Sequence, residues 1–454
     1  MKEPFRLFPV FMSTGFRLSA EPIEPSLPEV HASVRISHSP IAWRRLLGFL
    51  GPGFLISVGY MDPGNWATDI AGGSRFGYTL LFVIMASNLM AILLQSLSLK
   101  LGVATERDLA QMCHEHYGRW VSFVLWVGAE IAIAACDLAE VIGSAIALNL
   151  LFHIPLLYGV LITGLDVLLI LLMQRWGFRY VEALVITLIG TIIAMFGVQL
   201  FLSRPEYGPV LSNLFIPSSS IVTNPAMLYI AIGILGATVM PHNLYLHSSI
   251  VQSRRYKRTP EGKREAIFMS NVDSALALTV ALFVNAAILI VAAAVFHRSG
   301  HYEVAAIQDA YKLLSPLLGA AGASTLFAIA LLASGQNSSI TGTLAGQVVM
   351  EGFIHLKLSP WLRRMITRTL AIIPTIIVVA ITGEQGTEKL LILSQVILSL
   401  QLSFAVVPLV IFTGSRKIMG EFVNARWLQG LAWFTAVLIA GLNAWLLIET
   451  AMGR

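Results

Sequence analysis

The sequence predicts an all-α integral membrane protein with eleven transmembrane helices arranged as two inverted halves, in which helices 1 and 6 are discontinuous. Three observations indicate this fold class. Hydrophobic residues make up 56% of the 454 positions and charged residues only 12%, whereas soluble domains carry about a quarter charged residues. The apolar residues gather in runs long enough to cross a bilayer. Two of these runs are interrupted in the same way at matching places.

The apolar runs define the individual helices. A helix needs roughly 20 mostly apolar residues to cross the hydrocarbon of a bilayer. By that criterion the chain has eleven spans, and the eighth is long enough to require a strong tilt. The spans lie near residues 46–75, 78–100, 120–149, 154–174, 181–203, 226–254, 271–296, 316–350, 365–383, 389–413 and 428–450.

The regions around the spans complete the predicted organisation. Residues 1–43 include the Pro- and Ser-rich stretch EPIEPSLPEVHASVRISHSP and no signal-peptide pattern, so they predict a disordered cytoplasmic tail. The transmembrane domain covers residues 44–454, with one repeat at about 44–204, a second at about 224–414 and an extra helix at about 428–450. Two cysteines allow at most a single disulfide bridge.

The basic residues indicate how the chain is oriented. With a cytoplasmic N-terminus and an external C-terminus, only six of the thirty Lys and Arg residues lie outside: Arg75, Arg204, Arg298, Lys312, Lys389 and Arg454. This asymmetry is what the positive-inside rule requires. The basic loop RRYKRTPEGKRE after the sixth span is then an inward anchor. Because the basic residues sort by membrane side, the net charge of +5 does not indicate a nucleic-acid-binding protein.

Two interruptions point to a binding site within the membrane. The first span is broken by Met61-Asp62-Pro63-Gly64-Asn65, and the sixth by Val239-Met240-Pro241-His242-Asn243. Each break has an apolar or acidic residue, then Pro, then one residue, then Asn. Because five spans separate the breaks, the two halves enter the membrane from opposite sides. Broken helices at matching places in inverted halves are a good sequence pointer to a transporter's binding site.

The chemistry of the breaks favours a cation. A lone proline can merely kink a helix, but here polar groups accompany each proline. The half-helix before each break ends in carbonyl groups with partial negative charge, and Asp62 adds a full negative charge. An ionisable residue within the membrane is functional by default. The amide oxygen of Asn65 and the thioether of Met240 complete the set. Sulfur favours transition metals over Mg²⁺ and Ca²⁺, although Met240 could equally be an apolar packing residue.

DPGN at residues 62–65, together with ATVMPHNLYLHS at residues 237–248, resembles the Nramp family of proton-coupled divalent-metal transporters. The resemblance covers about residues 44–450. It implies the inverted five-helix repeat also found in sodium-coupled amino-acid transporters, with an eleventh helix added. It also implies that Asp62, Asn65 and Met240 are metal ligands together with the carbonyl of Ala237.

Two further metal-site residues follow from the same resemblance. Gly59 stands where relatives often have Ala, and its backbone carbonyl would serve as a ligand equally well. Gln395 in the tenth span matches a family position whose amide joins the site in some conformations. Without the resemblance, a glutamine at that place would more often hydrogen-bond to a neighbouring helix.

The third span carries carboxylates that suit a proton route. Glu130 and Asp137 lie about 20° apart around a helix, and Glu140 about 60° from Asp137, so the three form one stripe. The alternative is structural pairing with Arg254 and Arg364 near the inner ends of the sixth and ninth spans.

The resemblance assigns part of this stripe to the proton route. It implies that Asp137, Glu140 and His242 belong to the route, with Arg254 and Arg364 beyond them. His242 can titrate near neutral pH. His247 lies about 140° round the helix from His242, so we expect a structural role for it.

Together these observations predict a secondary transporter and not an enzyme. We expect it to import Mn²⁺ or Fe²⁺, and ions like Cd²⁺ and Co²⁺, with protons by alternating access across the cell membrane. We expect a monomer in the lipid bilayer, without a resident cofactor. An amino-acid transporter of the same fold is disfavoured because Asp62 and Met240 would oppose a substrate carboxylate. No nucleophile–base arrangement supports an enzyme, and a channel would need a continuous pore.

Overall fold

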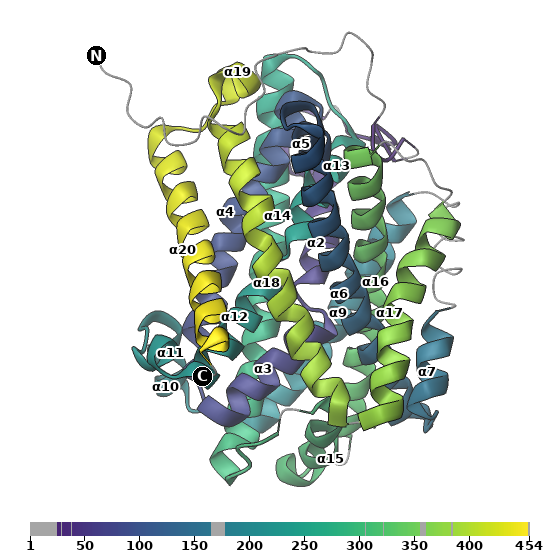
Figure 1. The fold of residues 1–454 in the computed structure, drawn as a ribbon, viewed down its shortest axis with the longest axis vertical. Helices are drawn as coiled ribbons and strands as arrows, with labels where there is room; N and C mark the ends of the chain where they lie inside the picture. The colour runs from purple at the N-terminus through teal and green to yellow at the C-terminus, as the bar shows by residue number, and fades with distance from the viewer. Residues whose placement is uncertain are drawn as a thin grey trace.

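A computed structural model describes residues 25–164, 178–354, 360–382 and 385–452, apart from residues 29, 38, 305 and 321. Figure 1 shows helices packed side by side along the longest axis of the molecule. The described chain also includes a short parallel pair, formed by β1 (Val34–Arg35) and β2 (Arg254–Arg255).

The helices follow the two predicted halves. The first half contains α1 (Ala42–Phe49), α2 (Pro52–Gly59), α3 (Pro63–Phe76), α4 (Leu81–Thr105), α5 (Leu109–His116), α6 (Arg119–Phe152), α7 (Leu156–Thr163) and α9 (Phe178–Ser203). The second half and the extra helix contain α10 (Tyr207–Phe215), α11 (Ser220–Thr223), α12 (Pro225–Thr238), α13 (Pro241–Ile250), η1 (Val251–Ser253), α14 (Pro260–Val295), η2 (His297–Ser299), α15 (Ile307–Leu318), α16 (Ala323–Ile354), α17 (Pro360–Thr382), α18 (Gln385–Gly414), α19 (Arg416–Met419), η3 (Gly420–Phe422) and α20 (Arg426–Ala451).

Seven described helical segments are long and apolar enough to cross a membrane. They correspond to predicted spans two, three, five, six, seven, ten and eleven. The first predicted span is divided between α2 and α3, each too short to cross alone, and the fourth continues beyond α7 outside the described residues. The count of eleven therefore stays a prediction.

The eighth predicted span is wrong in its extent. Residues 316–350 were expected to form one tilted helix, but the chain forms α15 and α16 with a turn between them. Gly319 ends α15 with φ at +65°, in the left-handed region that glycine adopts readily. The span is thereby shortened only to the 32 residues of α16, which still exceeds the roughly 20 residues that cross a bilayer. The seventh helix also begins earlier than predicted, at Pro260, because Thr259 caps it by accepting a hydrogen bond from the Gly262 backbone.

The two broken helices lie at the centre of the bundle. α3, from the first broken helix, packs against α12 and α14. α13, from the second broken helix, packs against α4 and α16. Large apolar side chains point outward from several helices; Phe201 and Trp120 are 81% and 80% exposed, for example. In a soluble protein such exposure would be unfavourable, whereas in a bilayer these side chains face lipid. The chain is therefore a multi-pass membrane protein.

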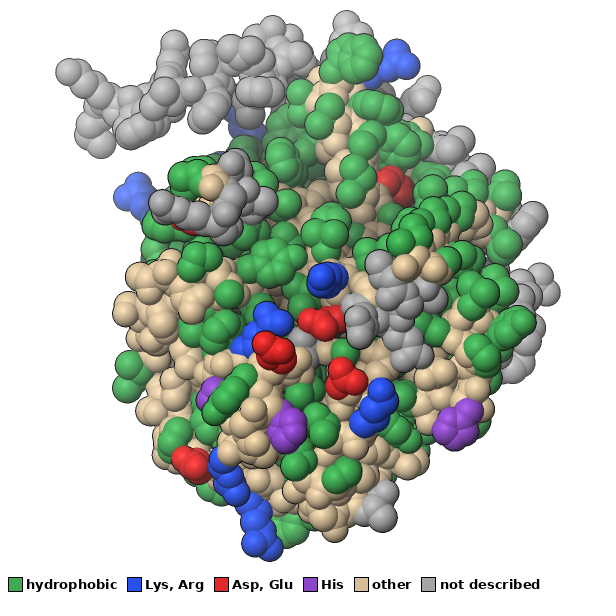
Figure 2. All heavy atoms as spheres, turned by 60° about the horizontal axis from the view of Figure 1, so that its bottom comes forward, with side chains coloured by type: hydrophobic (Ala, Val, Ile, Leu, Met, Phe, Trp, Pro, Cys, Tyr) green, Lys and Arg blue, Asp and Glu red, His purple; other side chains and the backbone are tan. Residues whose placement is uncertain are grey.

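One end of the bundle is polar. Viewed from the end that carries α15, at the bottom of Figure 1, acidic and basic side chains lie near the middle of the face among hydrophobic ones (Figure 2). A cavity of about 660 Å³ opens between α3, α12, α18 and α20, and its lining includes Arg75, Glu388, Lys389 and Glu449. This polar end is the one predicted to be extracellular.

Part of the N-terminal segment is ordered, contrary to the expectation of a disordered tail over residues 1–43. Leu27, Val30 and Val34 are buried. Val34 pairs with Arg254 through the β1–β2 ladder, and the Ala32 amide donates to the Gln252 carbonyl at 3.0 Å. The apolar side chains and the backbone pairing together offset the entropy of ordering this strap, defined here as residues 25–36. Residues 1–24 lie outside the described part of the chain.

Candidate metal site

Both predicted breaks occur where the sequence places them. α2 ends at Gly59 and α3 begins at Pro63, with Asp62 as its N-cap. α12 ends at Thr238 and α13 begins at Pro241, with Met240 as its N-cap. Proline is suited to the first position of a helix because its missing N–H would be unpaired there. The discontinuity of helices 1 and 6 is therefore confirmed.

The side-chain amide of Asn65 connects the first break to the second. The Asn65 Nδ2 donates to Asp62 Oδ1 at 2.9 Å and to the Ala237 carbonyl oxygen at 2.9 Å. The Asn65 backbone N–H also donates to Asp62 Oδ1, at 2.8 Å. Asp62, Asn65 and Ala237 are each 0% exposed. Two oxygens suited to a cation thus share one NH₂ group in a site closed to solvent.

The freed carbonyls of the first break have partners. The Met61 carbonyl accepts from Trp66 Nε1 at 3.1 Å and from the Ser334 hydroxyl. The Tyr60 carbonyl accepts from Asn285 Nδ2 at 2.7 Å. Buried carbonyls without partners would be costly, so these bonds allow the helix to be broken at membrane depth.

Met240 lies in a small apolar cluster beside the polar groups. The cluster contains Ala135 and Cys136 of α6 and Leu398 of α18. Gly59 faces the same side chain, because a Cβ added at Gly59 would lie 3.1 Å from Met240 Sδ. The structure thus brings Met240 of the second break against Gly59 of the first.

Gln395 covers the first break from α18. Its Nε2 lies 3.5 Å from Asp62 Oδ2, and a Cβ added at Gly64 would come within 1.7 Å of that nitrogen. Gly64 is therefore required for this close approach. In this arrangement Gln395 presents its nitrogen to Asp62.

Two members of the predicted carboxylate stripe lie together on the buried face of α6. A Cβ added at Gly342 of α16 would be 3.1 Å from both Asp137 Oδ1 and Glu140 Oε1. The Ser338 hydroxyl donates to Glu140 Oε1 at 2.9 Å. Glu130 lies further along α6, where Trp126 Nε1 donates to it at 3.2 Å.

His242 lies in the first turn of α13. Its side chain is 1% exposed, and neither ring nitrogen has a hydrogen-bond partner among the residues that the structure describes. A buried imidazole in this condition has capacity to accept or donate a hydrogen bond.

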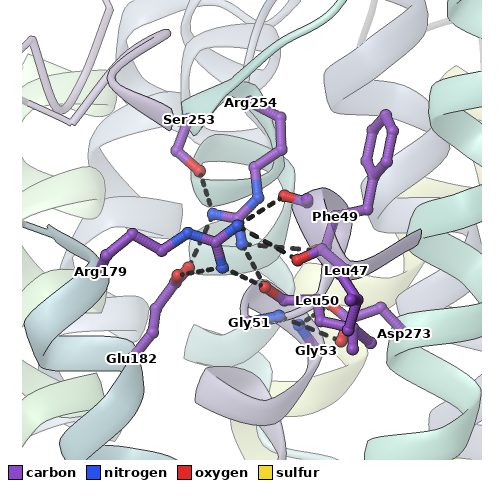
Figure 3. A network of polar contacts seen from close by, with 11 residues as sticks. Leu47, Phe49, Leu50, Gly51, Gly53, Arg179, Glu182, Ser253, Arg254 and Asp273 are labelled. Carbon is purple, nitrogen blue, oxygen red and sulfur yellow. Dashed lines mark hydrogen bonds and ion pairs between the residues drawn. The ribbon is translucent and has the colours of Figure 1, made fainter. Parts of the chain in front are cut away.

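The suggested pairing of Arg254 with the α6 carboxylates is wrong. Arg254 Nη1 instead donates to Glu182 Oε1 of α9 at 2.7 Å, and both side chains are buried. The guanidinium points toward Glu182 in Figure 3. Arg179 Nη1 also contacts Glu182, at 3.1 Å. The sequence gives α9 no motif that would have identified Glu182 as the partner. The side chain of Arg364 lies outside the described residues.

The same region fixes the start of the first broken helix (Figure 3). Arg254 Nη2 donates to the Leu50 carbonyl at 2.7 Å, while Asp273 Oδ2 accepts from the Gly53 amide at 2.7 Å. Gly51 between them has φ at +137°, and an added Cβ would lie 2.5 Å from Glu182. We call Arg179, Glu182, Arg254 and Asp273 the Arg254 network. It ties the α1–α2 link to α9, β2 and α14.

Sequence reasoning missed several polar residues around the site. Gln95 of α4 joins the Tyr60 hydroxyl at 2.9 Å to His247 Nδ1 at 2.9 Å. This contact agrees with the structural role expected of His247. The available signal was a glutamine in the middle of an apolar span. Asn285 in the seventh span gave the same kind of signal.

Comparison with known proteins identifies the family. The sequence pattern of the family described as "Natural resistance-associated macrophage protein-like" (Nramp) matches residues 53–449. The chain belongs to the Nramp family. It is 63% identical over 429 residues to the divalent metal cation transporter MntH of Nostoc sp., covering 94% of this chain and 97% of the relative. The MntH of Mesorhizobium japonicum is 60% identical, with 95% of each chain covered. These Nramp relatives are named as transporters and not as enzymes.

Solved structures agree with the fold. A manganese transporter of Eremococcus coleocola, solved with an aromatic bis-isothiourea compound, is 44% identical with a TM-score of 0.87, covering 94% of this chain and 90% of the other. MhsT in complex with L-phenylalanine aligns with a TM-score of 0.54 at 16% identity, covering 88% and 97%. That second likeness concerns the fold alone. The predicted fold class, shared by Nramp proteins and amino-acid transporters, is confirmed.

Proposed function

We propose that this Nramp protein is a proton-coupled secondary transporter that imports divalent transition metal ions by alternating access. Mn²⁺ and Fe²⁺ are the proposed substrates, with ions such as Cd²⁺ and Co²⁺ also accepted. The observation that carries the proposal is the convergence of Asp62, Asn65 and Ala237 from two broken helices at one buried place, with Met240 of the second break beside Gly59 of the first. The names of the MntH relatives and of the manganese transporter support the choice of metal.

Each ligand has a definable contribution. Asp62 supplies the full negative charge that replaces part of the ion's hydration. The Ala237 carbonyl supplies a second oxygen, and the amide of Asn65 must turn to present its oxygen in place of the NH₂ group that now bridges both. Met240 supplies a sulfur, which transition metals accept more readily than Ca²⁺ or Mg²⁺. The Gly59 carbonyl and the Gln395 amide are the remaining proposed ligands.

Alternating access follows from the burial of the site. Since the proposed ligands are 0% exposed, an ion can enter or leave only if one side opens. Gln395 covers Asp62 on the side of α18, and the Arg254 network holds α2 at its other end. In the proposed cycle these two groups of contacts break in turn.

The proton route is proposed from α6 and α13. Asp137, Glu140 and His242 can each carry a proton, and the two carboxylates share the face toward α16. Glu130, Arg254 and Arg364 are the proposed outer members of the route. Proton movement alongside the metal would supply the driving force for import.

An amino-acid transporter is the second candidate, because the fold is shared with a protein that binds L-phenylalanine. Helix N-termini with free N–H groups recognise a substrate carboxylate in that fold type. Here the Asn65 N–H is already bonded to Asp62, and the Asp62 carboxylate would repel a second one. The metal proposal is therefore the better supported of the two.

Uptake into proteoliposomes tests the function. Purified protein should accumulate Mn²⁺, faster with an inward proton gradient than without one. Asp62→Ala should abolish uptake at matched protein content, because neutral ligands alone do not dehydrate a dication well enough. Near-normal uptake by Asp62→Ala, or wild-type uptake of L-phenylalanine and not Mn²⁺, would overturn the assignment.

Proton coupling is tested separately with Asp137→Asn and His242→Ala. Each variant should retain Mn²⁺ binding but show reduced metal-stimulated acidification of the vesicle interior. The measurement combines a pH-sensitive dye inside the vesicles with metal uptake. If both variants acidify as the wild type does, these residues are not the proton carriers.

A further inference from the structure

The asparagine of each break contacts the side chain three residues before it and a carbonyl of the other broken helix. Asn65 Nδ2 donates to the side chain of Asp62, three residues earlier, and to a carbonyl of the other broken helix, Ala237. Asn243 Nδ2 contacts the side chain of Met240, three residues earlier, at 3.7 Å from Sδ. It also contacts a carbonyl of the other broken helix, Ile56, at 3.5 Å. The second repeat matches the first in the contact within its own helix, whereas across the break Asn243 reaches a carbonyl about one turn earlier than the position equivalent to Ala237.

We propose that Asn243 is an additional ligand for the transported ion, as the counterpart of Asn65 in the second repeat. This inference rests on the proposed metal transport. The ligands implied by the family resemblance in the second repeat are Ala237 and Met240, so Asn243 adds an oxygen donor to that half of the site.

The amide oxygen of Asn243 is available for this role. The side chain is 0% exposed, and Oδ1 has no hydrogen-bond partner within the described part of the chain. A buried polar atom left unpaired is unfavourable. The contact of Nδ2 with the Ile56 carbonyl is longer than the 2.7–3.2 Å of an ordinary N–H···O bond, and the Met240 sulfur is a weak acceptor, so little is lost if the amide rotates. Binding an ion would satisfy the oxygen.

Rotation of the amide by half a turn would place Oδ1 where Nδ2 now lies, close to Met240 Sδ. Two neighbouring ligands of one ion lie about as close together as atoms in van der Waals contact. The present separation of 3.7 Å between the amide nitrogen and the sulfur meets that requirement. Asn243 and Met240 can therefore bind one ion as neighbouring ligands.

Gly59 provides the space for this pair. A Cβ added there would lie 2.4 Å from Asn243 Nδ2 and 3.1 Å from Met240 Sδ. The first of these distances is too short for non-bonded atoms, so a methyl group would displace the amide. Gly59 thus leaves room for the present position of the Asn243 amide.

The expected effect is selective between ions. An amide oxygen is a hard donor, which Mn²⁺ accepts better than the softer Cd²⁺. Asn243→Leu, which has a similar shape but no oxygen, should therefore weaken Mn²⁺ binding more than Cd²⁺ binding. A Met240 substitution should have the opposite order.

Isothermal titration of the purified full-length protein in detergent measures this effect. Asn243→Leu should raise the Kd for Mn²⁺ about tenfold, equivalent to about 1.4 kcal/mol, with a smaller change for Cd²⁺. Asn443→Leu is the matched control, because Asn443 is also a buried asparagine but bonds to Ser399 from α20. It should leave both affinities unchanged. Wild-type affinity for Mn²⁺ in Asn243→Leu would overturn the inference, whereas a wild type that binds no divalent ion would overturn the proposed function itself.

Two more variants guard against a folding defect in Asn243→Leu. Asn243→Asp keeps the shape and adds a charged oxygen, so it should bind Mn²⁺ more tightly and admit Ca²⁺; an unchanged profile would contradict the inference.

Gly59→Ala should weaken Mn²⁺ binding several-fold in the wild type but much less in Asn243→Ala, where the crowded amide is absent. Equal effects in the two backgrounds would show that Gly59 does not act through Asn243.

Discussion

At the scale of single residues, Met240 is the ligand proposed to separate transition metals from the more abundant Ca²⁺ and Mg²⁺. Its sulfur would occupy a ligand position where those ions prefer oxygen or water. Specificity is a difference between affinities, so disfavouring the wrong ion is sufficient. Met240 packs with Cys136 and Leu398, and its sulfur lies beside Gly59 of the first break.

Met240→Ala should therefore reduce Mn²⁺ transport only modestly, weaken Cd²⁺ transport more, and allow Ca²⁺ to compete. A loss of about 1–2 kcal/mol in discrimination corresponds to roughly a tenfold change in relative affinity. Competition in proteoliposomes, with fixed Mn²⁺ and rising Ca²⁺, provides the measurement. If Ca²⁺ inhibits wild type and variant equally and Cd²⁺ transport is unchanged, Met240 is only a packing residue.

Asp108 links protonation to stability at the end of the molecule away from α15. It caps α5 and accepts a hydrogen bond from Ser26 of the strap. Burial raises the pKa of the Asp108 carboxyl to about 6, although hydrogen bonds from Ser26 and from the backbone of Gln111 and Ala110 oppose the change. The pKa in the unfolded chain is about 3.9. Between these values the folded state binds more protons, so the free energy of unfolding falls as the pH rises from about 4 to about 6.

Asp108→Asn should remove this contribution, because asparagine is also a good N-cap but does not titrate. Relative to the wild type, the variant should therefore gain thermal stability as the pH is raised through that window. Unfolding temperatures in detergent between pH 4.5 and 7.5 measure the difference. Parallel curves for the two proteins would contradict the assignment.

The sequence predicted which residues belong to the candidate site better than it predicted which groups those residues contact. Asp62, Asn65, Ala237 and Met240 were named from two short motifs; Asn65 joins Asp62 to Ala237, and Met240 lies beside Gly59 of the first break. Sequence reasoning counted only the negative ends of the half-helices. In the folded chain Asp62 also caps the N-terminus of α3, which stabilises its charge. The direction of a side chain relative to the next helix could not be obtained from the spacing.

At the scale of helices, the Arg254 network connects four elements that are distant in sequence. Removing one partner of a buried ion pair typically costs about 3–5 kcal/mol, because the other charge is left unpaired. Glu182→Gln should therefore loosen the α1–α2 link at Leu50 and Gly51, whose contacts Arg254 and Asp273 provide.

Hydrogen exchange measures this loosening. Residues 47–59 should exchange faster in Glu182→Gln than in the wild type. Glu265→Gln is the matched control, because Glu265 forms an ion pair with Arg45 at the surface, with 44% of its side chain exposed. Surface pairs contribute little, so this control should leave exchange unchanged. Equal exchange in all three proteins would mean that the network does not hold α2.

Element boundaries differed from the predictions for identifiable reasons. Hydropathy merged α15 and α16 because the turn between them is short and contains small residues such as Gly319. The strap was predicted to be disordered because the segment is rich in Pro and Ser. Its order depends on pairing with Arg254 and Arg255, more than two hundred residues away, and such a long-range contact leaves no local pattern.

At the scale of the whole molecule, the asymmetry of basic residues predicts a cytoplasmic N-terminus and an external C-terminus in the cell membrane. The predicted inner end then carries α5, the strap and β2, and the predicted outer end carries α15 (Figure 1). Hydropathy and two motifs were sufficient for the fold class because the bilayer restricts a chain to few architectures. The partners of individual charges required the folded chain, as Arg254 and Glu182 illustrate.

Cysteine labelling in intact cells tests the orientation. Lys312→Cys on α15 should react with a membrane-impermeant maleimide from outside, whereas Lys257→Cys should react only after permeabilisation; both positions are exposed. The native Cys113 and Cys136 are buried and serve as a low background. The reverse pattern of labelling would invert the proposed topology.

The NH₂ group of Asn65 has a consequence for a transport cycle. A carrier that accumulates its cargo must return without the ion in half of every cycle. In that half, closing the site would bury a negative charge with no cation beside it, which would be unfavourable. Because the amide nitrogen bridges Asp62 and Ala237, the protein contains its own partial positive charge in place of the missing ion. The return of the empty carrier therefore needs no second cation in the site. Its rate becomes linked to the rotation of the Asn65 amide.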